Sequence, residues 1–271
     1  MEREFSIVVL LFFCYSFIGW VWETIYCSFR AKHFVYRGFL LGPITPIYGF
    51  GVLGVLYFIA PYQNREIVVF GLAFLLVTVL EYVTSVLLEE LFQASLWDYK
   101  DMPLNINGRV AVPVSIFWGL CCLFIVERLN PWLLGIVAGW ENRFGIYLPI
   151  ILLMAISFDL GFTLSSVHSF RRGLNEISNA IQEKKEQLQL AVEENMDVPA
   201  QRLSEIKQQV TDRYDWVTEL VEQKDLKNRL PRLNFQERRL LSSFPRMKSK
   251  EITTSIEEIR KLVKEMRKKE K

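Results

Sequence analysis

Long apolar runs alternate with short polar connections over the first 170 residues of the chain. A helix that crosses the hydrocarbon core of a bilayer needs about 20 predominantly apolar residues. Several runs approach that length, which predicts an all-α, polytopic membrane helix bundle with about five spans. The predicted spans are residues 5–29, 44–60, 67–90, 111–128 and 147–169. The first is too long for a signal-peptide core and lacks a following cleavage site, so we expect it to be retained.

Two further apolar stretches break this regular pattern. Residues 130–145 are too short to span, and Trp132 and Trp140 are typical of the membrane interface, which predicts an interfacial segment. The stretch Arg37–Gly51 contains two prolines and four glycines beside a charge. Non-helical backbone at membrane depth is tolerated only where protein or a wet cavity surrounds it. This stretch is therefore either a re-entrant segment or a tight turn at a helix start.

Charge divides the chain near residue 170. Residues 1–170 hold 21 Lys, Arg, Asp and Glu residues, whereas residues 171–271 hold 41. We expect a transmembrane domain at 1–170 and a charged helical tail at 171–271. Lys and Arg are more frequent in the short loops on the side of the membrane that carries the tail. Since such an excess marks the cytoplasmic side, we predict a cytoplasmic tail and an outside N-terminus.

Apolar residues recur at heptad spacing in the first part of the tail. Residues 171–228 are predicted to form an antiparallel helical hairpin, or a coiled coil between subunits of a homo-oligomer. Residues 229–271 carry a net charge of +8 and are predicted to form basic amphipathic helices. Their apolar face either lies on anionic lipid or packs on the hairpin. No nucleic-acid-binding motif accompanies the charge, so no nucleic-acid partner is expected.

Three acids lie inside predicted spans, namely Glu23, Glu81 and Asp159. An unpaired charge at a helix centre costs about 2.5–3.5 kcal/mol on insertion scales, so each must be neutral, paired or exposed to water. Arg37 and Arg109 follow the first and third spans on the predicted inner side. The same order of features occurs twice. In each case an acid inside a span is followed by an inner loop, an adjacent Gly and Arg, a Pro and the next helix. We therefore predict that these acids and arginines meet in one polar pocket at the inner leaflet.

The connection after the third span adds polar and aromatic candidates to this pocket. They are Trp97, Asp98, Tyr99, Asn105 and Asn107. The four cysteines have no metal-binding spacing, and no phosphate-binding G-x-x-x-x-G-K-[ST] motif occurs. No cofactor or metal is therefore expected, and ATP-driven activity would need a separate ATPase subunit.

An ordered set of motifs carries a resemblance. The motifs are FIGWVWETIY, YRGFLLGPITPIYGFG, LEYVTSVLLEELF, WDY and NINGRV followed by SIFWG. Over roughly residues 10–130 they resemble the bacterial membrane-protein family labelled putative ABC-transporter type IV, or CmpB-like. The resemblance implies an integral protein of the bacterial plasma membrane with a permease-like role. Many members carry a serine after WDY, where this chain has Lys100.

Three functions fit these features. The first is a permease-like protein whose inner-leaflet pocket handles an ion, a small polar solute or a lipid headgroup. The second is a membrane-embedded enzyme acting on a lipid or polar headgroup, although no catalytic residue can be assigned. The third is a membrane-anchored scaffold or regulator that acts through its tail. The third leaves the acids within the spans unexplained.

Overall fold

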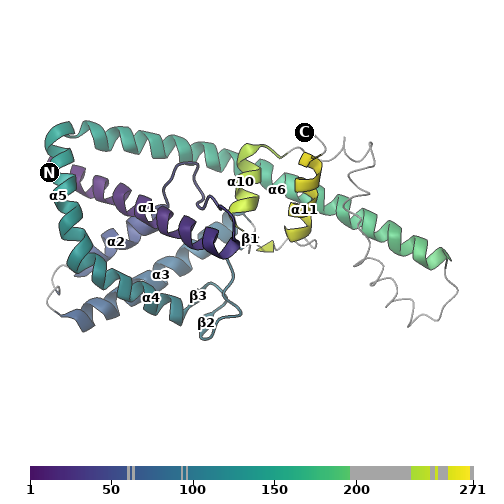
Figure 1. Cartoon of the computed structure of the whole chain (residues 1–271), viewed down its shortest axis with the longest axis horizontal. Helices are drawn as coiled ribbons and strands as arrows, with labels where there is room; N and C mark the ends of the chain where they lie inside the picture. The colour runs from purple at the N-terminus through teal and green to yellow at the C-terminus, as the bar shows by residue number, and fades with distance from the viewer. Residues whose placement is uncertain are drawn as a thin grey trace.

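A computed structural model describes residues 1–59, 62, 65–92, 94–95, 97–195, 233–244, 248–249 and 256–268. Within these ranges the chain consists of helices and four two-residue strands, which confirms the all-α class. The principal helices of the apolar half are α1 (Glu2–Ala31), α2 (Pro46–Ile59), α3 (Glu66–Phe92), α4 (Val112–Phe124), α5 (Asn130–Phe144) and α6 (Tyr147–Asn195). Figure 1 shows them as an elongated bundle, beyond which α6 continues.

Among the described residues, four helical stretches are long and apolar enough to cross a membrane. They are Glu2–Ala31, Glu66–Leu91, Val112–Phe144 and Tyr147–Gln187. The predicted span 44–60 corresponds to α2, which has only 14 residues. At 1.5 Å per residue α2 is about 21 Å long, shorter than the roughly 30 Å of a hydrocarbon core. α2 begins at Pro46, two residues after the start of the predicted span, and residue 60 lies outside the described residues.

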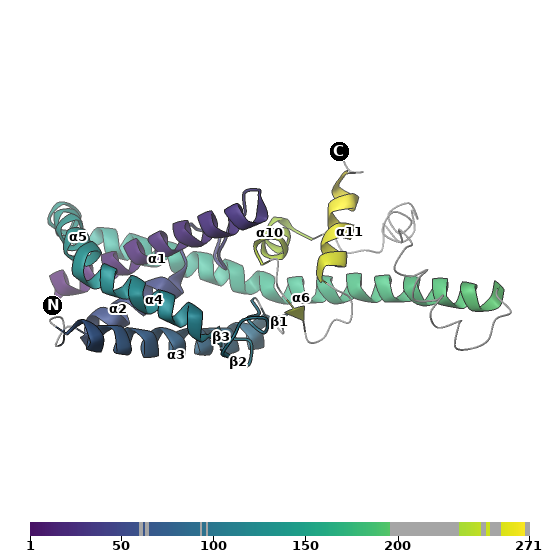
Figure 2. The same ribbon diagram turned by 60° about the horizontal axis from the view of Figure 1, so that its bottom comes forward.

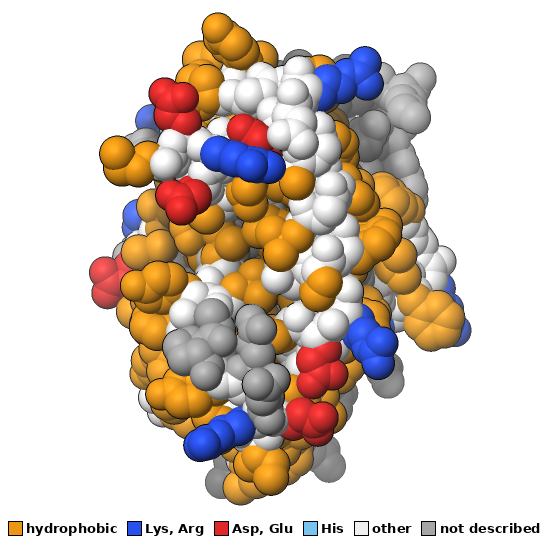
Figure 3. Space-filling model, turned by 90° about the vertical axis from the view of Figure 1, so that its left-hand side faces the viewer, with side chains coloured by type: hydrophobic (Ala, Val, Ile, Leu, Met, Phe, Trp, Pro, Cys, Tyr) orange, Lys and Arg blue, Asp and Glu red, His pale blue; other side chains and the backbone are white. Residues whose placement is uncertain are grey.

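The outside of the bundle is apolar. On α3, Leu75, Val79, Val83 and Leu87 lie four residues apart and are each more than half exposed. A stripe of this kind on one face of a helix needs an apolar environment. Figure 3 shows the end of the bundle that lies away from the tail, where hydrophobic side chains dominate and charges of both signs are scattered. This surface is that of a membrane protein.

The predicted interfacial segment 130–145 is not separate from the fourth span. A π-helical turn at Ile125–Leu129 joins α4 to α5, so that one helical run extends from Val112 to Phe144. The run bends at this turn (Figure 1), and π-bulges and prolines such as Pro131 are recognised causes of helix bending. Leu133 and Val137 of α5 pack in a cluster with residues of α1 and α2. Proline and glycine suggested a break where the helix only bends, and the position of this segment at the membrane interface stays a prediction.

Two glycines bring α1 and α2 into close contact. A Cβ atom at Gly19 would lie 2.2 Å from the ring of Tyr48, and one at Gly49 would lie 2.3 Å from the Ser16 Oγ. Real Cβ atoms do not approach other atoms so closely, so both positions require glycine. Small residues at membrane helix interfaces allow this close packing of backbones.

Beyond the bundle, α6 carries two helices from the end of the chain, α10 (Phe235–Ser243) and α11 (Ile256–Lys268). Figure 2 shows α10 beside the end of α1 and α11 farther along α6. The three helices share one hydrophobic cluster, which includes Phe170 and Ile177 of α6, Leu240 of α10 and Ile259 of α11. The apolar face of α11 is thus covered by protein. The predicted second arm of the tail hairpin lies within residues 196–232, outside the described residues.

Short strands complete the fold at this end of the bundle. β1 (Ala94–Ser95) pairs antiparallel with β4 (Lys248–Ser249), which links the end of α3 to the tail. β2 (Asn105–Ile106) pairs antiparallel with β3 (Val110–Ala111) directly before α4. The β2–β3 hairpin turns at Asn107 and Gly108, which both have positive φ, as is typical of an Asn-Gly turn.

Candidate functional site

The stretch that follows α1 folds back into the helix bundle and is called the re-entrant loop below. Its chain runs back along α1: the Val35 amide donates to Ser28 Oγ at 2.9 Å, and Trp20 Nε1 donates to the Arg37 carbonyl at 2.7 Å. At its far end the Thr45 amide donates to the carbonyl of Ser16 at 3.0 Å. Ser16 lies 15 residues before the end of α1, which corresponds to about 22 Å of helix. The α2 helix therefore begins deep inside the bundle, next to the middle of α1.

Asp159 of α6 holds this re-entrant loop. Its carboxylate accepts hydrogen bonds from the Leu41 amide at 2.9 Å and from the Gly42 amide at 2.7 Å. The hydroxyl of Thr163 donates to the same carboxylate at 3.1 Å. A loop within a bilayer cannot obtain such partners from water, so an acceptor must come from a neighbouring helix. The acid at the middle of the fifth predicted span thus satisfies irregular backbone.

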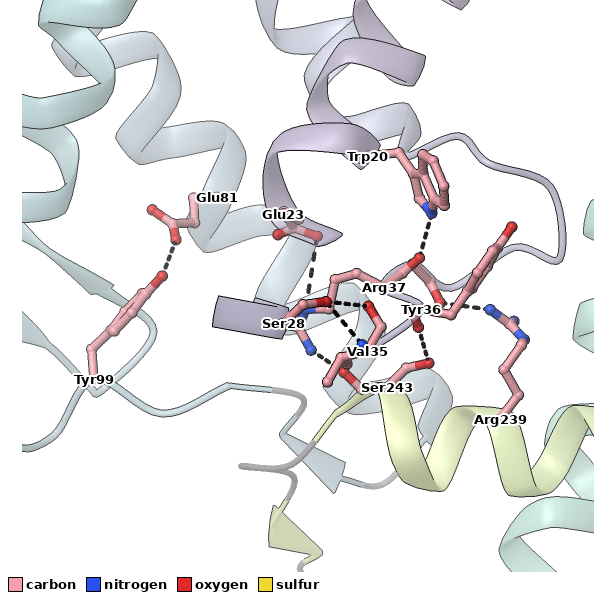
Figure 4. Close-up of polar contacts among 11 residues, drawn as sticks. Trp20, Glu23, Ser28, Val35, Tyr36, Arg37, Glu81, Tyr99, Arg239 and Ser243 are labelled. Atoms are coloured by element: carbon pink, nitrogen blue, oxygen red, sulfur yellow. Dashed lines mark hydrogen bonds and ion pairs between the residues drawn. The ribbon is translucent and has the colours of Figure 1, made fainter. Parts of the chain in front are cut away.

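The other two predicted acids lie in one polar cluster with residues from three further segments (Figure 4). Arg37 Nε lies 3.9 Å from Glu23 Oε2, a contact that is an ion pair and not a hydrogen bond. The Tyr48 hydroxyl at the start of α2 interacts electrostatically with Glu23, Glu81 and Tyr99. The Tyr99 hydroxyl donates to Glu81 Oε1 at 3.1 Å. Glu23, Arg37, Tyr48, Glu81 and Tyr99 are called the polar cluster below.

The polar cluster retains hydrogen-bonding capacity. The Oε2 atom of Glu81 and the Nε atom of Arg37 are buried and have no hydrogen-bond partner among the described residues. Burial, and then the charge of Glu81, raise the pKa of Tyr99, so its hydroxyl stays protonated as a donor. Tyr48 packs its ring against Trp118 of α4 with centroids 5.2 Å apart. The cluster therefore offers carboxylate oxygens beside aromatic rings inside the bundle.

Arg109 does not join the polar cluster. Its Nη2 and Nε atoms bind Glu89 Oε2 at 2.5 and 3.2 Å, and its Nη1 lies 3.4 Å from the Tyr82 hydroxyl. The hydrogen bond to Glu89 raises the pKa of Arg109. Glu89 follows Glu81 by eight residues on α3 and was not among the candidates. The two loops therefore place their arginines differently, although their sequence order is similar.

The remaining predicted residues shape the loop between α3 and α4. Trp97 Nε1 donates to the Arg109 carbonyl at 2.9 Å, and Asp98 Oδ1 accepts from the Lys100 amide at 2.9 Å. The Asn105 side chain accepts from the Gly108 amide at 3.0 Å. Asn107 Nδ2 lies 3.4 Å from the Tyr82 hydroxyl. These contacts position Tyr99 and close the turn, and none of them joins the polar cluster directly.

Helix α10 meets the re-entrant loop from the tail side. Arg37 Nη1 donates to the Ser243 carbonyl, and its guanidinium lies 4.8 Å from the centre of the Phe244 ring. Arg239 donates to the carbonyls of Gly38 at 3.0 Å and Phe39 at 2.7 Å. Burial lowers the pKa of Arg239. These contacts join residues some 200 positions apart, and no local sequence pattern predicts them.

The comparisons with known proteins agree with a membrane bundle of this kind. The apolar helices of this chain define a membrane protein, and the family match relates it to transport. A family model described as Putative ABC-transporter type IV matches residues 10–164, and the chain belongs to this family. The match extends through Asp159 and Thr163, beyond the motifs recognised in the sequence, and leaves the tail outside. Searches of curated proteins and of solved structures find no match.

Proposed function

We propose that this protein is a permease-type component of the bacterial plasma membrane whose polar cluster binds a small monovalent cation. The observation that supports this most strongly is that the cluster brings two acids to one arginine. It places Glu23 and Glu81 inside the bundle beside a single arginine, Arg37. With both acids ionised the cluster carries a formal charge of −1, which one positive charge balances. Of an ion, a small polar solute and a lipid headgroup, the cation fits this charge best.

The position of the cluster supports passage of a solute. Glu23 lies on α1, Tyr48 at the start of the short helix α2, and Glu81 on α3. Interrupted helices are used in transporters to form binding sites near the middle of the membrane. The free Oε2 of Glu81 gives a direct ligand, and the aromatic ring of Tyr48 suits a cation at its face.

The membrane arrangement and partners belong to the same proposal. We place the tail in the cytoplasm and the N-terminus outside, with the polar cluster toward the inner leaflet. The sequence has no phosphate-binding loop of its own, so transport driven by ATP requires a separate ATPase subunit. A second copy of the chain is a further partner, and the surrounding lipid covers the apolar stripe of α3.

The enzyme alternative has less support. It requires Asp98, Asn105 and Arg109 beside the two acids. Asp98 and Asn105 instead bind backbone of their own loop, and Arg109 is engaged by Glu89. The scaffold alternative leaves the polar cluster without a role.

A binding measurement tests the proposed function without an ATPase partner. Radiolabelled methylammonium is titrated onto the full-length protein in lipid nanodiscs, and the Glu81→Gln and Glu66→Gln variants are compared. Glu66 is an exposed acid in the first turn of the same helix. We expect Glu81→Gln to weaken binding about tenfold or more, since it removes a charged ligand, and Glu66→Gln to change it less than about twofold. Binding that is equal in all three proteins, or absent from the unmodified one, would refute the cation site.

A further inference from the structure

Residues of the tail helix α10 bind backbone carbonyls of the re-entrant loop. Of the four consecutive carbonyls from Tyr36 to Phe39, three accept hydrogen bonds from α10. Ser243 Oγ donates to Tyr36 at 2.5 Å, and Arg239 donates to Gly38 and Phe39. The fourth carbonyl, that of Arg37, accepts from Trp20 of α1. The loop is thus held between α1 on one side and α10 on the other, as Figure 4 shows.

α10 also determines where Arg37 points. The guanidinium donates to the Ser243 carbonyl at the end of α10 and covers the Phe244 ring. Its contact with Glu23 is 3.9 Å long, and the Nε atom that faces this acid makes no hydrogen bond with a described residue. The tail and the polar cluster therefore compete for the same arginine. In the docked arrangement the tail has the closer contact.

A second chain of contacts joins α10 to the tip of the loop. Gln236 Nε2 donates to Thr163 Oγ1 at 3.0 Å, and that hydroxyl donates to Asp159. Asp159 in turn holds the amides of Leu41 and Gly42. Movement of α10 would therefore disturb both the outer part of the loop and the tip that leads into α2.

α10 is complete as a helix without the loop. Asn234 and Glu237 form a capping box at its first turn, with each side chain bound to the backbone of the other. Arg260 of α11 donates to the carbonyls of Leu241 and Phe244 at its last turn. The contacts of α10 with the re-entrant loop are thus additional to those that define the helix. They can be broken while α10 remains helical.

We propose that α10 is a gate helix that controls access to the polar cluster. In the docked state it fixes the re-entrant loop and holds Arg37 away from a hydrogen bond with Glu23. In the undocked state it releases the loop carbonyls and lets Arg37 turn to Glu23. The assignment of the cluster as the site rests on the proposed function, whereas the link between α10 and the loop does not depend on which solute binds.

Hydrogen–deuterium exchange of the full-length protein in nanodiscs tests the gate. The variant is Arg239→Gln, and the matched control is Arg238→Gln, an exposed neighbour whose hydrogen bond goes to Leu233 of its own segment. We expect Arg239→Gln to speed exchange of the amides of Leu41, Gly42, Ile44 and Thr45 about tenfold, because local opening becomes easier. The control should leave them within about twofold. Equal exchange in the two variants would overturn the gate.

Two further measurements separate a gate from simple loss of structure. Exchange within α3 should stay unchanged in Arg239→Gln. If it rises as well, Ser243→Ala, which removes one hydrogen bond only, replaces that variant, and its effect at the same four amides decides. In the methylammonium assay, Arg239→Gln should raise the association and dissociation rates together about tenfold. Unchanged rates beside faster loop exchange would show a structural role and overturn the gate. Absence of methylammonium binding to the unmodified protein would contradict the cation site, while the exchange result would still report on α10.

Discussion

Gly49→Ala tests the close contact between α1 and α2, on which the depth of the re-entrant loop depends. The new Cβ would lie 2.3 Å from Ser16 Oγ, 2.6 Å from a ring carbon of Phe12 and 2.7 Å from the Phe12 carbonyl oxygen. The serine hydroxyl can rotate away, but the carbonyl belongs to the backbone of α1. The two helices must therefore separate to restore ordinary contact distances.

The magnitude follows from two opposing terms. Overpacking of a tight core costs about 1–3 kcal/mol. Alanine is about 1 kcal/mol more favourable than glycine inside a helix, which reduces the loss. We expect a net decrease of about 1–2 kcal/mol in the free energy of unfolding. Gly71→Ala is the matched control, because Gly71 lies in α3 and a Cβ there would meet no atom within 4 Å.

Unfolding by sodium dodecyl sulfate in mixed micelles, followed by circular dichroism, measures both variants. Gly71→Ala should unfold at the same or a higher denaturant fraction than the unmodified protein, and Gly49→Ala at a lower one. If Gly49→Ala proved as stable as Gly71→Ala, α2 would not pack against the middle of α1. The re-entrant path would then be incorrect.

Two other predictions concern charged side chains. Asp159→Asn should lower the free energy of unfolding by about 2 kcal/mol, since the asparagine side chain has one acceptor oxygen for the two backbone amides of the loop. The control Ser165→Ala, at an exposed position of α6, should leave that free energy unchanged. Equal unfolding midpoints for the two variants would contradict this role of Asp159. In a double-mutant cycle, Arg109→Gln and Glu89→Gln should show a coupling of about 1 kcal/mol, measured by the same denaturation. Purely additive effects would show that the pair contributes no coupling energy.

The sequence predicts the helical class and the need for partners at Glu23, Glu81 and Asp159, because charge inside an apolar run is costly wherever the run folds. It also identifies the stretch after α1 as irregular, since proline and glycine act locally. It does not reveal which partner each acid takes. Asp159 binds backbone amides of the loop, a choice that depends on how α6 lies against that loop.

The roles of Arg109 and of the tail were missed for related reasons. Arg109 and Arg37 occupy similar places in two similar orders of residues, yet Glu89 lies within reach of the first and Ser243 within reach of the second. Side-chain reach is set by helix rotation and by the packing of distant segments. Arg239 reads in the sequence as one more charge in a basic tail, and only its burial against Gly38 and Phe39 marks it as different.

The account depends most on the re-entrant loop, whose tip meets Asp159 within the bundle. Solid-state NMR can measure this directly in lipid bilayers, as the dipolar coupling between ¹³C in the aspartate carboxyl group and ¹⁵N in the glycine amide. With N–O distances of 2.7 and 2.9 Å at the two loop amides, the Asp159 carboxyl carbon should lie about 3.5–4 Å from the Gly42 nitrogen. We predict a coupling of that strength that disappears in the Asp159→Asn protein. A spectrum in which the substitution changes nothing would place the loop outside the bundle and contradict the account.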